Sequence, residues 1–447
     1  MKILFISLGC DKNLVDSEKM LGILCHGGYE FTNQEEKADI IIVNTCCFIG
    51  DAKEESIQWI LEMAQYKEIG VCKALIVTGC LAERYQQEMM QELPEVDGVL
   101  GIASWHNIME VVEAALKKNK PHCFEDKNTL PKSEGRRVLT TGGHYAYLKI
   151  AEGCDKHCTY CIIPQIRGAY RSVPMEELVA EAETLAEQGV KELILVAQET
   201  TLYGVDLYGR KSLPELIQKL ALVAGIQWIR IQYCYPEEIT DEFIQTIKEE
   251  PKVCHYLDIP IQHASDRILK RMGRRTNRVQ LTAMIEKLRE EIPDIVLRTT
   301  LIAGFPGETE EDYEELLDFV DEMEFDRLGV FAYSPEEGTP AAMMLNQISE
   351  DVKEKRRDGI MELQQEIAFS HCEEQIGRVL EVMIEGKVAD ENAYVGRTYM
   401  DGPGVDGYIF IQSSEEYMSG DFVMVKVTGA AEYDLIGEVI YEDEFTE

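Results

Sequence analysis

Three cysteines within one short segment carry the clearest chemical signal in the sequence. Cys154, Cys158 and Cys161 form a CxxxCxxC run directly after a predicted strand. Three thiolates on one loop can bind three irons of a 4Fe-4S cluster and leave the fourth iron open to another ligand. An open metal position is where a substrate can be bound and activated. The run therefore predicts a catalytic iron–sulfur cluster with these three cysteines as its ligands.

A structural zinc ion is the alternative for this run. Such sites usually close with four protein ligands, often contributed by two CxxC pairs. His157 could be a fourth ligand, but it is adjacent to Cys158 and is therefore poorly placed to share a metal with it. The spacing favours the iron–sulfur cluster.

Three further cysteines, far apart in the sequence, follow predicted strands in the same way. Cys10, Cys46 and Cys80 each come just past an apolar run rich in β-branched residues, at positions 3–6, 40–43 and 74–77. The carboxyl ends of parallel strands meet at one edge of a sheet, where ligands bind. We therefore expect the three thiols to converge and predict a second metal site. A buried structural role is the alternative for each cysteine alone, because free Cys packs like a small hydrophobe.

The elements that must position these cysteines fall into three predicted domains. Residues 1–116 alternate apolar runs with helical patterns, which is typical of a doubly wound parallel sheet. Residues 117–143 are polar and broken by prolines, which indicates a linker. Residues 144–372 contain six strand-like runs between helical patterns and predict a partial (β/α)6 barrel with catalytic groups at the carboxyl strand ends. Residues 373–447 change to short alternating runs with glycine turns, which predict a small all-β barrel.

Composition limits the compartment and the partners. The chain has 82 acidic against 44 basic residues and a formal net charge of -38, which repels phosphate backbones and favours a cationic partner. The apolar run after Met1 is too short for a signal peptide. No apolar run reaches the roughly 18 residues that a membrane span requires. We therefore expect a cytoplasmic protein without a membrane anchor, in which clustered cysteines stay reduced and bind metal or act in catalysis.

The CxxxCxxC run, with Tyr160 before its last cysteine, resembles the radical S-adenosylmethionine superfamily, and the whole chain resembles its methylthiotransferase family. Residues 7–13, Asn-Thr-Cys at 44–46 and Thr-Gly-Cys at 78–80 are similar to the amino-terminal domain of that family. Segments 158–174, 258–263 and 304–309 are similar to its radical core, and the final barrel is similar to its TRAM domain. Cys47 stands where the family has glycine, and Val173 stands where it has arginine. Cys46 remains the predicted ligand because it keeps the Asn-Thr-Cys register.

The resemblance implies two 4Fe-4S clusters, an auxiliary cluster on Cys10, Cys46 and Cys80 and a radical cluster that binds S-adenosyl-L-methionine. It also implies that one cofactor molecule methylates sulfur carried on the auxiliary cluster and a second is reductively cleaved to a radical that abstracts the substrate hydrogen. A reducing electron donor and a sulfur donor are implied as partners. The two clusters must then face each other, so we expect the edge of the amino-terminal sheet over the barrel mouth.

Several other side chains are expected at the cofactor or behind it. The resemblance places Tyr160 near the adenine, with ordinary packing as the alternative. Arg298 lies on a strand that should be buried on both faces, where an unpaired guanidinium is costly. We expect it to pair with the cofactor carboxylate or with an internal carboxylate such as Asp258. Gln198 follows the second barrel strand and is expected on the catalytic face, whereas we expect His263, after the fourth strand, to be a scaffold residue.

The substrate class follows from a motif and from charge. Members of the family modify either an adenosine of transfer RNA or an aspartate of a small-subunit ribosomal protein, and Cys-Asp-Lys-Asn at Cys10 is similar to the ribosomal-protein branch. Residues 377–447 carry sixteen acidic and four basic side chains, a net charge of -12. Such a module suits a basic ribosomal protein, although an acidic surface can also serve only solubility.

We therefore predict methylthiolation of the β-carbon of an aspartate in the twelfth small-subunit ribosomal protein. A transfer-RNA adenosine methylthiotransferase is the first alternative, because it would share both clusters and differ in its partner. A noncatalytic iron–sulfur binding or assembly protein is the second. The intact CxxxCxxC loop argues against this second alternative.

Overall fold

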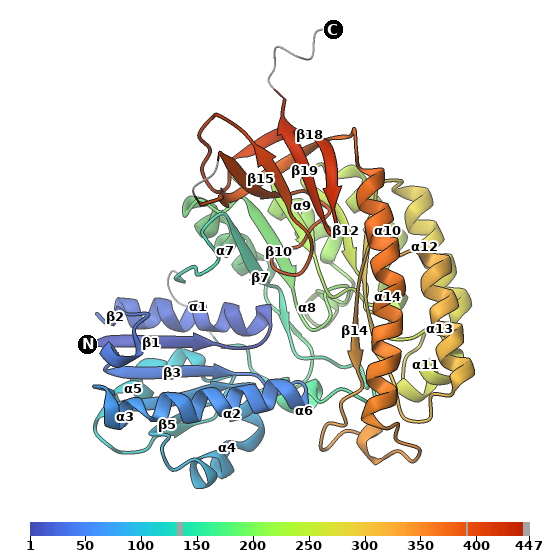
Figure 1. The fold of residues 1–447 in the computed structure, drawn as a ribbon. Coiled ribbons are helices and arrows are strands. Elements are labelled where there is room, and N and C mark those ends of the chain that lie inside the picture. Colours follow the sequence, from blue (N-terminus) through green and yellow to red (C-terminus); the bar gives the residue numbers. More distant parts are fainter. Residues whose placement is uncertain (132–136, 390–391, 441–447) are drawn as a thin grey trace.

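Three structural parts follow one another along the chain (Figure 1). The computed structural model describes residues 1–131, 137–389 and 392–440. An amino-terminal α/β part is followed by a larger α/β core and then by a small β-barrel. In the described part of the chain, no helix is long and apolar enough to cross a membrane.

The amino-terminal part is a six-stranded parallel sheet in the order β2-β1-β3-β4-β5-β6. Alternate residues of one strand point to opposite faces. Ile40 and Ile42 pack against helices α1 and α5, while Ile41 and Val43 pack against α2 and α4. The doubly wound sheet that the sequence predicts is therefore present. Its elements are β1 (Lys2–Ser7), α1 (Asp11–His26), β2 (Glu30–Phe31), β3 (Ile40–Thr45), α2 (Gly50–Ala64), α3 (Tyr66–Ile69), β4 (Ala74–Gly79), α4 (Cys80–Glu92), β5 (Gly98–Leu100), α5 (Ile108–Leu116) and β6 (His122–Cys123).

Strand β6 departs from the predicted domain boundary. The sequence predicts a linker over residues 117–143, yet His122 and Cys123 pair with β5 and form the edge of the sheet. A two-residue strand has no apolar run that would mark it in the sequence. Residues 132–136 of the predicted linker lie outside the described residues.

The core is a second six-stranded parallel sheet, in the order β14-β13-β12-β11-β10-β7. The order ends at β14 and β7, so the sheet is open, as expected of a partial barrel. Its strands are β7 (Tyr145–Lys149), β10 (Glu192–Val196), β11 (Trp228–Ile231), β12 (Val253–Asp258), β13 (Val296–Ala303) and β14 (Arg327–Ala332). The covering helices include α7 (Met175–Glu187), α9 (Leu213–Ala221), α10 (Asp241–Glu249), α12 (Arg278–Glu291) and α13 (Glu310–Met323).

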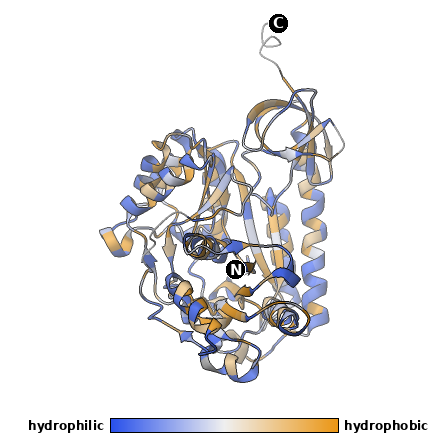
Figure 2. Cartoon of the chain, turned by 90° about the vertical axis from the view of Figure 1, so that its left-hand side faces the viewer, coloured by the Kyte–Doolittle hydropathy of each residue, from blue (hydrophilic) through white to orange (hydrophobic). Residues whose placement is uncertain are grey.

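The interior of these layers is apolar. Residues from all five covering helices join the sheet in one hydrophobic cluster. Figure 2 shows the hydrophobic colouring gathered on the central strands, while the outer helices carry both colours. Burial of this apolar surface is the main force that holds the strand ends in place.

Helix α14 (Glu350–Glu374) runs along the open edge of the core at β14 and leads to the final barrel (Figure 1). This barrel closes in the order β15-β16-β17-β19-β18, as the predicted all-β module requires. Its strands are β15 (Val379–Lys387), β16 (Ala393–Arg397), β17 (Ile409–Gln412), β18 (Phe422–Ala431) and β19 (Asp434–Val439).

A buried charge cluster fixes the barrel to the core sheet. Glu192, at the start of β10, lies 2.7 Å from Arg230 of β11 and 2.7 Å from Arg397 of β16, and all three side chains are fully buried. Burial opposes ionisation of Glu192, but Arg397 and then Arg230 lower its pKa below the ordinary value. Paired buried charges of this kind favour one docking geometry, because breaking the pair leaves an uncompensated charge.

Candidate active site

The CxxxCxxC loop lies between a short hairpin strand, β8 (Ala151–Glu152), and helix α6 (Ile163–Arg167). Cys154 and Cys158 are buried and Cys161 is partly buried. The backbone N–H of Lys156 donates to Cys154 Sγ over 3.4 Å. Burial, and then the nearby Cys158, raise the pKa of the Cys154 thiol to about 12. The loop thus gathers its cysteines in a sheltered position with a backbone donor aimed at sulfur, which suits an iron–sulfur cluster.

An aromatic and cationic wall stands beside Cys158. The Tyr235 hydroxyl is 3.5 Å from Cys158 Sγ, and the guanidinium of Arg274 lies 4.3 Å from the centroid of the Tyr235 ring. Arg274 donates from Nη2 to the carbonyl of Pro260, while its buried Nε and Nη1 have no hydrogen-bond partner. Buried donors are normally satisfied. These two therefore mark a place for an anionic group next to the loop.

The predicted residue Tyr160 belongs to this wall. It packs against a small cluster that contains Ile268, Phe305 and Tyr333. Burial, and then Cys158, raise the pKa of its hydroxyl well above the ordinary value. The position is compatible with both expectations stated for it, a place at the adenine and packing behind the cluster.

The loops that carry Cys10, Cys46 and Cys80 converge at the carboxyl edge of the amino-terminal sheet. Cys10 precedes α1, Cys46 follows β3 and Cys80 begins α4. Gly9 has a φ of +88°, and a Cβ there would lie 2.7 Å from Cys46 Cβ. The loops that carry Cys10 and Cys46 therefore touch.

Asn13 ties these loops together. Its Nδ2 donates to the carbonyls of Leu8 at 3.1 Å and Thr45 at 2.9 Å. Its Oδ1 lies 3.7 Å from Cys80 Sγ and accepts from Arg167. The amide thus contacts all three loops. Sequence spacing gave no signal of this role, because the contacts arise only when the loops meet.

Cys47, the neighbour of the predicted ligand Cys46, packs in the same hydrophobic cluster as Cys80. It is fully buried in the hydrophobic cluster between the sheet, α2 and α4. Burial raises the pKa of its thiol to about 12, while Arg84 opposes this rise. For Cys46, burial and a charge on Cys10 both raise the thiol pKa. The contacts favour Cys46 as the residue that faces Cys10.

Neither cysteine trio has the geometry of a single-ion site. Within the described residues, no three His, Cys, Asp or Glu side chains lie close enough together to hold one metal ion. The structural zinc alternative required such a group, with ligand atoms about 2.0–2.3 Å from the ion. A cube of four irons separates its thiolates more widely, since each cysteine binds a different iron.

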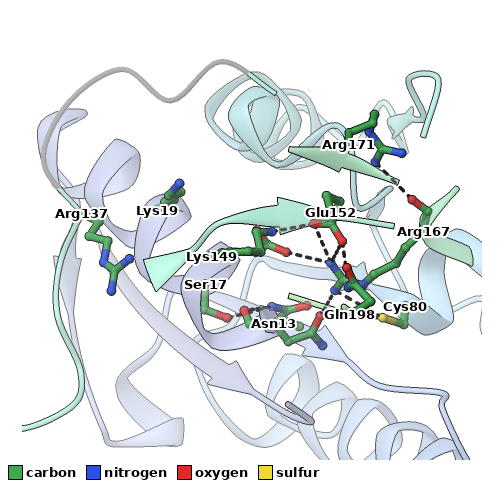
Figure 3. A network of polar contacts seen from close by, with 12 residues as sticks. Asn13, Ser17, Lys19, Cys80, Arg137, Lys149, Glu152, Arg167, Arg171 and Gln198 are labelled. Atoms are coloured by element: carbon green, nitrogen blue, oxygen red, sulfur yellow. Dashed lines mark hydrogen bonds and ion pairs between the residues drawn. The ribbon is translucent and has the colours of Figure 1, made fainter. Parts of the chain in front are cut away.

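A buried polar network runs from Cys80 of the amino-terminal part to Glu152 of the core (Figure 3). Arg167, 1% exposed, lies 2.9 Å from Glu152 and 3.4 Å from Asp16, and its Nη2 donates to Cys80 Sγ over 3.5 Å. Glu152 is two residues before Cys154. Burial opposes ionisation of Glu152, but Arg167 and then Lys149 lower its pKa. The amino-terminal part thus contacts helix α6, which follows the CxxxCxxC loop of the core.

Two further predicted residues lie near this network or behind it. Gln198 donates to Glu152 over 3.0 Å, and its buried Oε1 has no partner. His263 is fully buried, and its Nδ1 accepts from the backbone N–H groups of Ala264 and Ser265 at 3.0 and 2.9 Å. Gln198 therefore reaches the site, whereas the contacts of His263 are those of a scaffold residue.

Arg298 is engaged by protein carboxylates. Its Nη1 lies 3.3 Å from Asp258 Oδ1 and its Nε lies 3.4 Å from Asp406 Oδ1 of the final barrel. Burial opposes the charge, but Tyr256 and then these carboxylates raise its pKa. These contacts fit the internal ion pair, one of the two roles expected for this residue, because Nη1 and Nε each have a carboxylate partner.

Three family models match the chain in sequence order. Residues 2–101 match Uncharacterized protein family UPF0004, residues 148–320 match the Radical SAM superfamily and residues 376–440 match the TRAM domain. All three matches fall within the three structural parts described above.

Curated relatives match over nearly the full length. The chain is 64% identical over 437 residues to a ribosomal protein uS12 methylthiotransferase RimO of Lachnoclostridium phytofermentans, covering 98% of this chain and 99% of the relative. It is 52% identical over 448 residues to a protein of the same name from Acetivibrio thermocellus, covering 99% of each.

Solved structures share the fold at low sequence identity. The radical S-adenosylmethionine methyltransferase TsrM from Kitasatospora setae, described with cobalamin and a [4Fe-4S] cluster bound, matches with a TM-score of 0.56 and 12% identity over 76% of this chain and 74% of its own. A second TsrM structure, with tryptophan substrate and a SAM analogue, matches with a TM-score of 0.55 and 13% identity, covering 76% and 75%.

Proposed function

The chain belongs to the family of ribosomal protein uS12 methylthiotransferases RimO, and from this premise we propose that it attaches a methylthio group to the β-carbon of an aspartate in uS12. It is a radical SAM methylthiotransferase that uses an iron–sulfur cluster and S-adenosylmethionine. The proposal adds a second cluster and the identity of the modified atom. The observation that supports it is that Arg167 contacts both Cys80 of one trio and Glu152, which lies two residues before Cys154 of the other.

The residues that would hold the cofactors are drawn from both sides of this junction. Cys154, Cys158 and Cys161 would bind the radical cluster and leave one iron for S-adenosylmethionine. The unpaired Nε and Nη1 of Arg274 suit an anionic group of that cofactor. The auxiliary cluster would lie on the other three cysteines: Cys10, Cys46 and Cys80.

When bound, the cofactors supply a radical that can remove hydrogen from an unactivated C–H bond, which no side chain can remove as a proton at neutral pH. The protein itself orients the cofactors and the substrate and shelters them from water. Arg167 holds the two ligand loops together, and Asn13 fixes the approach of the three amino-terminal loops. Tyr235 and Tyr160 line the radical side, where exclusion of water protects a reactive intermediate.

The final barrel supports the choice of partner. Residues 377–447, which include this barrel, carry a net charge of -12 that would repel transfer RNA and attract a basic ribosomal protein. The transfer-RNA alternative also loses support because the relatives that match over nearly their whole length are named as uS12 methylthiotransferases. We propose that a reducing electron donor and a sulfur donor complete the reaction, because reductive cleavage of S-adenosylmethionine would consume an electron and the substrate C–H bond contains no sulfur.

Mass spectrometry of uS12 tests the function. The purified enzyme, reconstituted without oxygen, is supplied with S-adenosylmethionine, a reductant, sulfide and uS12. We expect one aspartate to gain the mass of a methylthio group in place of hydrogen, with the change on its β-carbon. Modification of transfer-RNA adenosine in a parallel reaction, with unchanged uS12, would refute the proposal.

A further inference from the structure

Lys12 is a buried cation without an acidic partner at the junction of the two cysteine sites. It lies on the first turn of α1, two residues after Cys10, and is 6% exposed. Its Nζ lies 3.2 Å from the centroid of the Tyr233 ring. Within the described residues, this ring is the contact that its ammonium group makes, and no carboxylate lies within ion-pair distance of it.

The other buried lysines in the described part of the chain show how unusual this is. Lys149 pairs with Asp16 and lies 2.7 Å from Glu152, Lys156 lies 3.2 Å from Glu237, and Lys353 lies 2.6 Å from Glu350. Lysine is almost never buried without a partner, because loss of hydration disfavours the charge. An aromatic face offsets only part of this cost. The surroundings of Lys12 are therefore those of a site completed by an anion from outside the chain.

Tyr233 places this cation at the catalytic face of the core. It follows β11 and has a φ of +62°, which is rare for a residue with a bulky side chain. Two contacts hold it there: its backbone N–H donates to Asp258 at 3.1 Å, and its hydroxyl donates to Asp11 at 3.2 Å. Residues held in such conformations cluster at ligand clamps.

The other cations near the junction are already paired. Arg167 is bound by Glu152 and Asp16, and Arg298 by Asp258 and Asp406. Arg274 has free donors, but it stands beside Cys158 on the radical side. Among the residues that the structure describes, Lys12 is therefore the cation available next to the auxiliary cysteines for a group that enters between the two sites.

We propose that the Lys12 ammonium binds the side-chain carboxylate of the target aspartate. This inference rests on the proposed function, in which the β-carbon is modified. That carbon is bonded directly to the carboxylate carbon, so an ion pair that fixes the carboxylate also fixes the C–H bond to be broken. Specificity follows as well, because asparagine has the same shape and no charge and would leave the buried ammonium unpaired.

A double-substitution cycle in binding tests the ion pair without relying on turnover. Holoenzyme and Lys12→Met are each titrated anaerobically with natural uS12 and with uS12 whose target aspartate is replaced by asparagine, at one fixed salt concentration. We expect the natural enzyme to bind the aspartate form about 30-fold more tightly, as is typical when one partner of a buried charge pair is removed. Lys12→Met should bind both forms equally weakly, and Lys12→Arg should keep part of the preference.

Lys19→Met is the matched control. It removes the same charge from the same helix two turns further on, where Lys19 pairs with Glu181 at 3.3 Å. We expect it to keep the full preference for the aspartate form. Iron content and the electron paramagnetic resonance spectrum of each variant are recorded, so that loss of a cluster is not mistaken for loss of recognition.

Three outcomes would overturn the inference. The inference fails before any variant is measured if the natural enzyme binds the aspartate and asparagine forms equally. The inference also fails if Lys12→Met still binds the aspartate form more tightly than the asparagine form. A Lys12→Met enzyme that loses iron and weakens for both forms by the same factor would assign Lys12 to the cluster. If instead the natural enzyme leaves uS12 unmodified, the proposed function fails, whatever Lys12 binds.

Discussion

At the scale of single residues, Arg167 links the two cysteine sites from a fully buried position. In Arg167→Met, Glu152 and Asp16 would lose a cationic partner while remaining buried. Breaking a buried pair by removing one partner typically costs about 3–5 kcal/mol. We expect a loss of this size in the free energy of unfolding, measured by guanidinium denaturation of the cluster-free protein.

The control for this substitution is Arg210→Met. Arg210 pairs with Glu215 at 2.6 Å, but its side chain is 62% exposed. Exposed pairs contribute at most about 1 kcal/mol. An Arg167→Met protein no less stable than Arg210→Met would show that the network does not hold the two parts together.

Glu199 predicts a pH dependence of stability. Its side chain is fully buried, its Oε1 accepts from the backbone of Thr201 at 3.0 Å, and burial raises its pKa to about 7 from 4.5. The folded chain thus holds a proton that the unfolded chain releases between these two values. The contribution of Glu199 therefore lowers the free energy of unfolding as pH rises from 4.5 to about 7.

Glu199→Gln removes this titration. We expect the stability difference, variant minus natural protein, to grow through that pH interval by up to about 3 kcal/mol and to stay constant above it. Urea unfolding at a series of pH values measures the difference. A difference that does not change with pH would contradict the assignment, whatever its absolute size.

Residue roles could be predicted where they depend on local spacing. Cys154, Cys158 and Cys161 could be predicted because they lie within eight positions of one another. Cys10, Cys46 and Cys80 could be predicted because each follows a predicted strand. The roles of Asn13 and Arg274 could not be predicted in this way. Their contacts come from loops and helices that meet only in the folded chain, and polar residues in such segments usually face solvent.

At the scale of elements, the strand-to-helix turns decide where the ligands lie. Gly79, before Cys80, has a φ of +93°, and a Cβ there would lie 2.3 Å from Asn44 Oδ1 and 2.4 Å from the carbonyl of Thr45. In Gly79→Ala, the turn must therefore shift and move Cys80 away from its partners. We expect this variant to lose about half of its iron after reconstitution, since one of two clusters would be affected.

Gly28→Ala is the control for this substitution, because it adds backbone strain without crowding. Gly28 has a similar φ of +82°, but an added Cβ would meet nothing within 4 Å. We expect a stability cost of about 1 kcal/mol and unchanged iron content. Equal iron loss in both variants would show that the turn at Gly79 does not set the position of Cys80.

The long helices and strands could be predicted from the sequence, whereas the two-residue strands could not. The run at 40–43 is buried on both faces, so its continuous apolar character marks β3. Helix α14 spans the charged stretch that separates the core from the final barrel. Strands β2 and β6 contain two residues each, and their pairing is set by the neighbouring strands rather than by their own composition.

At the scale of the whole molecule, charge should guide the encounter with uS12. Glu381, Glu432 and Glu438 are exposed on the final barrel. Replacing all three with Gln should slow association severalfold at low salt and reduce its salt dependence, because steering by surface charge acts on the association rate. Stopped-flow binding at several salt concentrations measures both effects.

A matched variant carries the same charge change elsewhere. Glu54, Glu55 and Glu62 are exposed on α2 of the amino-terminal part, and their replacement by Gln changes the net charge by the same amount. We expect a smaller effect on association from this variant. Equal effects would mean that net charge, and not the acidic barrel, attracts the substrate.

The central claim is that two cysteine trios hold two clusters that act on one substrate. Iron analysis of anaerobically reconstituted protein tests it most directly, by comparing the natural chain with the triple variant Cys10→Ala, Cys46→Ala and Cys80→Ala. We predict about eight irons per natural chain and about four in the variant. The variant should still form 5′-deoxyadenosine but no methylthiolated uS12. A natural chain with only about four irons, or a triple variant that still makes the product, would contradict the account.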